Sequence, residues 1–250
     1  MRLLLHACCG PCSLEPTRIL RAAGHDVSLF FSNSNIAPES EYARRLATLR
    51  AWAQGEGLPV TEGARNPDAW EAAAGRIGAA EGDPARREAR CRACYRLRLE
   101  DAARFAAQAG FDGVGTTLSV SPYQYTGVIR EELSRAAGLT GVEAVFEDFR
   151  PFYEKATRRS REMGMYRQNY CGCRFSEAEA AAERAARKAQ RAAERAEQAA
   201  AHAAERAADE AARAARRAER AAYAEKQARK RAVLKALREQ ERDRDTHENQ

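Results

Sequence analysis

Residues 2–13 read RLLLHACCGPCS, a short apolar run that passes directly into a loop punctuated by cysteine, glycine and proline. Comparable apolar runs lie at 25–31, 58–63, 113–120 and 142–149, and stretches of helical character separate them. Short apolar strands that alternate with helices predict βαβ units and a parallel sheet. Because open parallel sheets bind ligands beyond the carboxyl ends of their strands, we expect the loop with Cys8, Cys9 and Cys12 to belong to a site.

Helices are predicted in the intervals between these strands. The first begins at Ser13 or Thr17 and ends near Gly24, and a linker rich in Gly, Pro and Arg is predicted at 81–90. Further helices are expected at 38–54, 68–80, 91–108, 122–138 and 153–163. The predicted fold class is therefore α/β.

The chain divides into two segments of different composition. Large apolar side chains are concentrated in residues 1–176, which we predict to form a metal-binding α/β catalytic domain. In residues 177–250, 28 of 74 residues are alanine and most others are charged or Gln, which predicts one long solvated helix. This tail is interpreted as a low-complexity extension without a catalytic role, or alternatively as an arginine-rich arm on RNA phosphates.

Net charge and hydropathy limit the partners and the cellular location that we expect for this protein. The formal net charge of +6 permits a polyanionic partner such as RNA without requiring one. No apolar run approaches the ~20 residues that a membrane helix needs, and the N-terminal run is too short for a signal peptide. We therefore expect a cytoplasmic protein with no membrane partner.

Seven cysteines form three clusters, at 8–12, 91–94 and 171–173. An odd number without a secretion signal argues against a disulfide framework and indicates metal binding, redox chemistry or both. On a helix, Cys91 and Cys94 share one face, so both sulfurs can reach one metal centre. Spacing alone favours a 4Fe-4S cluster and a Cys₄ zinc site equally, ahead of a simple thiol redox site.

The pair Cys171 and Cys173 is separated by one glycine and indicates separate chemistry. Such a pair can store two electrons as a dithiol and release them on forming a strained disulfide, although it can also supply two further metal ligands. The Cys9-Gly-Pro-Cys12 sequence is similar to a thioredoxin active site, but the extra cysteines disfavour that interpretation.

Five ordered motifs extend over the whole globular part: HACCGPCS (6–13), FFSNSNIAPESEYARRL (30–46), CRACYRLRLEDAA (91–103), TTLSVSPY (116–123) and MYRQNYCGCRFS (165–176). Together they resemble the cobalamin-independent epoxyqueuosine reductase family. The resemblance implies a Rossmann-like fold of the adenine-nucleotide hydrolase type. It also implies reduction of the epoxyqueuosine epoxide at the tRNA wobble position, with electrons from an unidentified donor.

The resemblance also implies roles for individual residues. It makes Cys8, Cys9, Cys91 and Cys94 the ligands of a 4Fe-4S cluster, and Cys171 with Cys173 the redox-active disulfide. We add the hypothesis that an additional mononuclear iron is held by Cys12 and Asp148. Candidate general acids are His6, Tyr42 and Asp148. Candidate substrate and phosphate contacts are Asn33, Asn35, Tyr42, Arg158 and Arg159, with further arginines at 44, 45, 161 and 167 and stacking surfaces at Tyr166 and Tyr170.

Two other functions stay open from the sequence. One is a zinc-stabilised RNA- or nucleotide-binding module without redox chemistry, which would be colourless. The other is a metal-free dithiol oxidoreductase that acts on proteins through one cysteine pair. Absorption spectra and metal analysis after anaerobic purification distinguish these from an iron–sulfur reductase.

Overall fold

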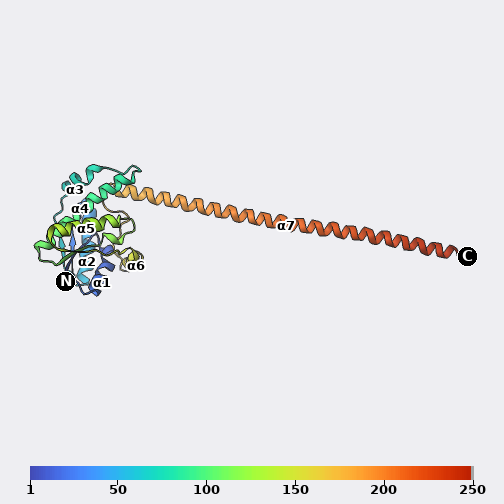
Figure 1. Cartoon of the computed structure of the whole chain (residues 1–250), viewed down its shortest axis with the longest axis horizontal. Coiled ribbons are helices and arrows are strands. Elements are labelled where there is room, and N and C mark those ends of the chain that lie inside the picture. Colours follow the sequence, from blue (N-terminus) through green and yellow to red (C-terminus); the bar gives the residue numbers. More distant parts are fainter. Residues whose placement is uncertain (249–250) are drawn as a thin grey trace. The chain divides into compact units, whose positions relative to one another are not determined.

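The computed structural model describes residues 1–248, without the side chains of Leu237 and of residues 239–248 (Figure 1). Its centre is a sheet of five parallel strands in the order β3-β2-β1-β4-β5. These strands are β1 (Arg2–His6), β2 (Asp26–Phe31), β3 (Val60–Glu62), β4 (Gly113–Thr116) and β5 (Glu143–Val145). The predicted α/β fold with a Rossmann-like parallel sheet is confirmed.

The strand order places β1 in the middle of the sheet. From β1 the chain moves outward to β2 and β3, and it then returns to the other side of β1 for β4 and β5. The direction of winding therefore reverses between β1 and β4, which is where open α/β sheets bind their ligands. The loops that follow these two strands are joined by a hydrogen bond of 3.1 Å from the backbone N–H of Cys8 to Oγ1 of Thr117.

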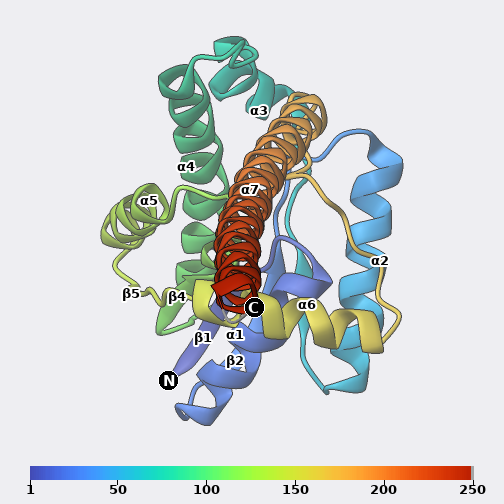
Figure 2. The same ribbon diagram turned by 90° about the vertical axis from the view of Figure 1, so that its right-hand side faces the viewer.

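Helices cover both faces of the sheet. They are α1 (Gly10–Ala22), α2 (Glu39–Gly55), α3 (Pro67–Ala73), α4 (Pro84–Gln108), α5 (Thr126–Thr140) and α6 (Tyr153–Glu162), with 3-10 turns at Gly75–Ile77, Leu118–Val120 and Arg150–Phe152. Because successive side chains of a strand point to opposite faces, Leu3 and Leu5 enter one core and Leu4 enters the other. The first core includes residues of α1 and α2, and the second includes residues of α4 and α5 (Figure 2).

Several predicted boundaries were wrong. The stretch predicted as a linker, 81–90, supplies most of the first two turns of α4, because Pro84 suits a first helical turn and the Asp83 carboxylate caps the N–H groups of Ala85 and Arg86. Helix α1 begins at Gly10, earlier than predicted, so Cys12 lies in its first turn. The predicted strands at 113–120 and 142–149 are shorter, and the first gives way to a 3-10 turn.

The predicted long helix of the tail is confirmed as α7 (Ser176–Glu248). Two compact units divide within it, the first being Met1–Glu183 and the second beginning at Arg184. The described side chains of the second unit are almost all exposed. None of the described helices is both long enough and apolar enough to span a bilayer. The roles assigned to residues 1–176 and 177–250 stay predictions.

Candidate metal and thiol site

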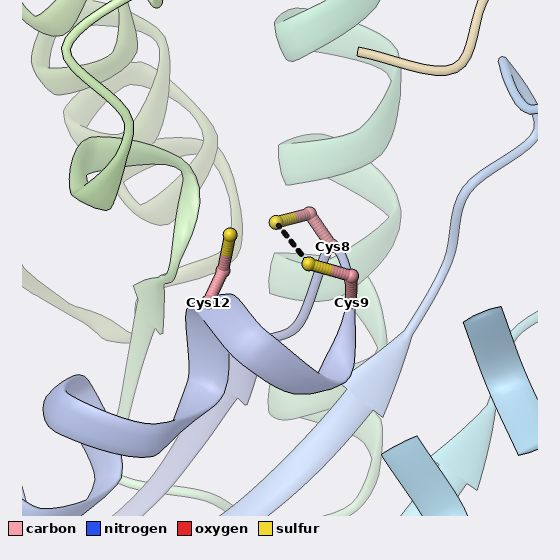
Figure 3. A group of neighbouring side chains, drawn as sticks. All are labelled: Cys8, Cys9 and Cys12. Atoms are coloured by element: carbon pink, nitrogen blue, oxygen red, sulfur yellow. Dashed lines mark hydrogen bonds between the residues drawn. The ribbon is translucent and has the colours of Figure 1, made fainter. Parts of the chain in front are cut away.

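Three cysteine thiols converge where β1 passes into α1 (Figure 3). Cys8 and Cys9 lie in the connection, and Cys12 lies in the first helical turn because the helix begins at Gly10. The three Sγ atoms lie within 4.8 Å of one another, and those of Cys8 and Cys9 are 3.9 Å apart. This group, called here the three-thiol cluster, is the donor set that thiolate-binding metals require.

Hydrogen bonds among the three thiols affect their protonation. A hydrogen bond with Cys12 lowers the pKa of Cys8, but the bond with Cys9 and burial raise it to about 11. Hydrogen bonds from Cys12 and Cys8 hold the pKa of Cys9 well below its usual range, whereas the pKa of Cys12 is raised by the same two partners. The cluster therefore favours the thiolate form of Cys9, and the thiolate is the form that binds metal.

The other four cysteines line one pocket. Cys91 and Cys94 come from α4, and Cys171 and Cys173 come from the loop before α7. The remaining lining residues are Trp70, Arg87, Arg90, Tyr95, Tyr123, Gln124, Ser176 and Glu179. All seven cysteines of the chain are free thiols in this structure. The pocket, called here the four-cysteine pocket, thus joins the two cysteine pairs that the sequence separates by 76 residues.

Charges on the cysteines of the pocket and of the three-thiol cluster affect the pKa values of neighbouring cysteines. Burial raises the pKa of Cys171, and the neighbouring charges of Cys94 and Cys8 raise it further. Burial also raises the pKa of Cys91, and the charge of Cys171 raises it further. Members of all three sequence clusters are therefore close enough to influence one another, at the end of the sheet where β1 and β4 terminate.

The backbone around Cys171 and Cys173 is fixed by hydrogen bonds from three directions. The Arg45 guanidinium donates to the carbonyl oxygen of Cys171 at 2.7 Å, and the N–H of Ala37 donates to that of Gly172 at 2.9 Å. The N–H of Gly172 donates to Oγ of Ser176 at 3.0 Å. Gly172 has a φ of +124°, and a Cβ there would lie 2.9 Å from Nη1 of Arg45. Glycine is therefore required between the two cysteines.

The asparagine loop after β2 lies beside the first cysteine loop. Asn33 is buried, and its amide donates to the carbonyl oxygen of Ala7 at 2.9 Å while its Oδ1 accepts from Arg98. Asn35 is also buried, and neither atom of its amide has a partner among the described residues. These two predicted substrate residues therefore differ, because Asn33 holds the loops together and Asn35 retains its hydrogen-bonding capacity.

The candidate general acids have different surroundings. His6 is buried between Thr116 and the carbonyl oxygen of Ser32, and burial followed by the charge of Arg98 lowers its pKa to about 3, so the ring is neutral. Tyr42 donates to Glu62 at 2.9 Å, and burial raises its pKa.

Asp148, Arg158 and Arg159 lie on the segment that follows β5. Asp148 accepts hydrogen bonds from Arg150, the shortest at 2.5 Å. Arg159 pairs with the buried carboxylate of Glu15 at 2.8 Å, whereas Arg158 is exposed. Among the described residues, the possible metal ligands grouped with Cys12 are the cysteines Cys8 and Cys9. Asp148 as an iron ligand therefore stays a hypothesis.

Sequence reasoning missed several residues of the site. Arg98 was not singled out from the sequence, and it is 2% exposed. Arg45 was predicted as a phosphate contact, but it is equally buried and binds Glu41 and the carbonyl oxygen of Cys171. Trp70 also lines the pocket, and it is buried in one cluster with Cys94 and Cys173. The available signal was the sequence spacing of Arg98, one helical turn after Cys94.

Comparison with known proteins agrees with this arrangement. A family model described as "Epoxyqueuosine reductase QueH" matches residues 3–179. The protein of that name from Thermotoga maritima is 33% identical over 182 residues, which cover 71% of this chain and 91% of the relative. Its namesake from Dehalococcoides mccartyi is 30% identical over 179 residues, which cover 71% and 93%. Another, from Staphylococcus epidermidis, is 30% identical over 183 residues, which cover 70% and 76%.

The matched region contains all seven cysteines and, except for Arg2 at the start of β1, every strand of the sheet. It ends at residue 179, within the first compact unit and before the exposed part of α7. Because the family model covers most of the chain, including the whole cysteine site, this chain belongs to the epoxyqueuosine reductase QueH family.

Proposed function

We propose that this chain reduces the epoxide of epoxyqueuosine at the tRNA wobble position to the alkene of queuosine. The observation that supports it most directly is a cluster of three thiols after β1, together with a pocket lined by the other four cysteines, in a member of this family. Reducing an epoxide to an alkene consumes two electrons and two protons and releases the oxygen as water. A site for this reaction must therefore supply electrons, and cysteine sites can do so directly or through a metal.

The chemistry of the donor set fits an iron–sulfur centre. We assign Cys8, Cys9, Cys91 and Cys94 as ligands of a 4Fe-4S cluster, and Cys12 with Asp148 as ligands of an additional mononuclear iron. The β1–α1 connection and α4 would each supply two thiolates, and four thiolates complete such a cluster. When bound, the iron–sulfur centre supplies single-electron transfer.

The pair Cys171 and Cys173 supplies the stoichiometric reductant in this proposal. As a dithiol it loses two electrons and two protons when the S–S bond forms, which balances the reduction of one epoxide to one alkene and water. A separate electron donor, not yet identified, must then reduce the disulfide. The support in the structure is that both cysteines are free and line the pocket that Cys91 and Cys94 also line.

Other side chains would bind and orient the nucleoside. Asn35 has an unpaired buried amide, and Asn33 fixes the loop on which both lie. We retain Tyr42, Arg158 and Arg159 as proposed contacts; Arg158 is exposed and suits a phosphate. An RNA substrate would also fit the expected cytoplasmic location.

Anaerobic purification followed by metal analysis and a tRNA nucleoside assay tests the proposal. We expect a brown protein with at least about four irons per chain that converts epoxyqueuosine in tRNA to queuosine. A colourless protein with stoichiometric zinc would instead support a zinc-stabilised RNA- or nucleotide-binding module. A metal-free protein that reduces protein disulfides would support a dithiol oxidoreductase.

A further inference from the structure

Arg98 is a buried cation beside the cysteine site with no acidic partner. It is 2% exposed and lies on α4 one turn after Cys94. Its guanidinium donates to the neutral Oδ1 of Asn33, and its Nε–H has no partner among the described residues. Among the side chains that the structure describes, no Asp or Glu forms an ion pair with it.

The same helix carries a buried arginine that is neutralised. Arg90 is also 2% exposed, and it binds both carboxylate oxygens of Glu179 at 2.6 and 2.7 Å. Arg45, the third arginine at this burial, pairs with Glu41 at 2.7 Å. Burial of a charge is costly unless an opposite charge compensates it. Arg98 therefore differs from its two counterparts in needing a negative partner that is not a carboxylate.

The groups around Arg98 identify that partner. Cys94 is buried and lies one turn before Arg98 on the same helix. Asn33, which accepts a hydrogen bond from Arg98, donates to the carbonyl oxygen of Ala7, the residue before Cys8. Arg98 therefore lies between Cys94 and the loop that carries Cys8, so we infer that its negative counterpart is a cysteine sulfur or a metal centre bound to these cysteines.

We propose that Arg98 is a positioning residue whose fixed positive charge compensates the metal–thiolate centre held by Cys94 and makes its reduction easier. This inference rests on the proposed function, because it requires the iron–sulfur centre. A 4Fe-4S cluster with four thiolates is anionic, and its reduction adds a further negative charge. A buried cation nearby stabilises the reduced state more than the oxidised state, since the surroundings screen charge less than water does.

The test compares Arg98→Gln with Arg98→Lys in the full chain, purified anaerobically. Gln keeps a donor for Asn33 and removes the charge, whereas Lys keeps the charge. We expect the midpoint potential of the Arg98→Gln cluster to be more negative than that of the wild type, and that of Arg98→Lys to stay close to it. Iron content per chain is measured in parallel.

A second variant covers the case in which Arg98→Gln does not fold. Asn33→Asp leaves Arg98 in place and gives it a carboxylate, so it should shift the potential in the same direction as Arg98→Gln. Equal potentials in the wild type and in every folded variant that removes or neutralises the charge would overturn the inference. A wild-type protein without iron would instead overturn the proposed function, so the two failures are distinguishable.

Discussion

The first two turns of α7 and the remainder of the same helix have similar compositions and opposite environments. In the first turns, Glu179 binds the buried Arg90 and accepts a hydrogen bond from the backbone N–H of Ala80. Glu183 binds Arg87. Beyond Arg184, a pair such as Glu225 and Arg229 also comes within 2.8 Å, but both side chains are at least 65% exposed. Both regions contain Glu–Arg ion pairs, and only the first pairs are shielded from water.

This difference shows that the free energy an ion pair contributes depends on its burial and not only on the distance between its charged atoms. Exposed pairs contribute about 0–1 kcal/mol, whereas removal of one partner from a buried pair costs about 3–5 kcal/mol. Glu179 also lines the four-cysteine pocket, so the first turns of α7 belong to the site. The comparison predicts that function and stability depend on the chain up to Glu183 and little on the helix after it.

The largest expected effect comes from Cys91→Ala, in the first unit. The change removes a proposed cluster thiolate, so iron content should fall and conversion of epoxyqueuosine to queuosine should be abolished. Iron quantification and nucleoside analysis of tRNA measure both. Ala93→Ser, on the same turn of α4, is the matched control and should retain iron and activity. Full iron content in Cys91→Ala would contradict the ligand assignment.

Cys171→Ser should separate cluster binding from turnover. A lone Cys173 cannot complete the dithiol–disulfide cycle, so turnover should be blocked while iron content stays near that of the wild type. The same two assays apply, with Cys91→Ala as the comparison. Iron loss as large as in Cys91→Ala would show that Cys171 ligates metal.

The fold could be predicted from the sequence because its strands are continuous apolar runs. Leu3, Leu4 and Leu5 are all fully buried, as expected for a strand covered by helices on both faces. The boundaries of α4 could not be predicted as well. The polar residues of 81–90 are typical of a linker, and their helical structure depends on Asp83 as a cap and on tertiary partners such as Glu179.

The cysteines of the site were identifiable from sequence because few residue types have comparable chemistry. The spacing did not predict that Cys91, Cys94, Cys171 and Cys173 line one pocket, since that depends on how the loop before α7 packs. Arg98 was missed as a site residue, and Arg45 was predicted as a phosphate contact, for a related reason. Arginine is mostly exposed, and only the folded structure shows these two guanidinium groups beside the cysteines.

Glu179→Gln should have a smaller effect than the cysteine substitutions, because it breaks one buried ion pair. It leaves Arg90 buried without its carboxylate, so the free energy of unfolding should decrease by about 3 kcal/mol. Glu225→Gln is the control in the exposed part of α7, where the change should stay within about 0.5 kcal/mol. Chemical denaturation of both variants measures this. Equal effects would remove the distinction between the two regions.

The ion pairs of the buried Glu15 should make the free energy of unfolding depend on pH. Its side chain is fully buried; burial would raise the pKa of the carboxyl, but Arg159, Arg18 and Lys155 hold it below its usual value. The resulting stabilisation is present above the ordinary carboxyl pKa of 4.5 and is lost as the pH falls through the lower folded-state value. The difference in unfolding free energy between the wild type and Glu15→Gln should therefore narrow below about pH 4.5. A difference that stays constant to lower pH would contradict this linkage.

The smallest expected effect comes from ending the chain after Glu183. Nearly every described side chain beyond that residue is exposed, so its removal takes almost no apolar area from a core. Iron content, the unfolding midpoint and the rate of epoxyqueuosine reduction at saturating tRNA should equal those of the full chain. Loss of folded protein would show that the removed helix is needed for stability. Weaker tRNA binding with unchanged chemistry would instead support the arginine-rich arm, because removing cationic side chains lowers affinity for phosphates and its salt dependence together.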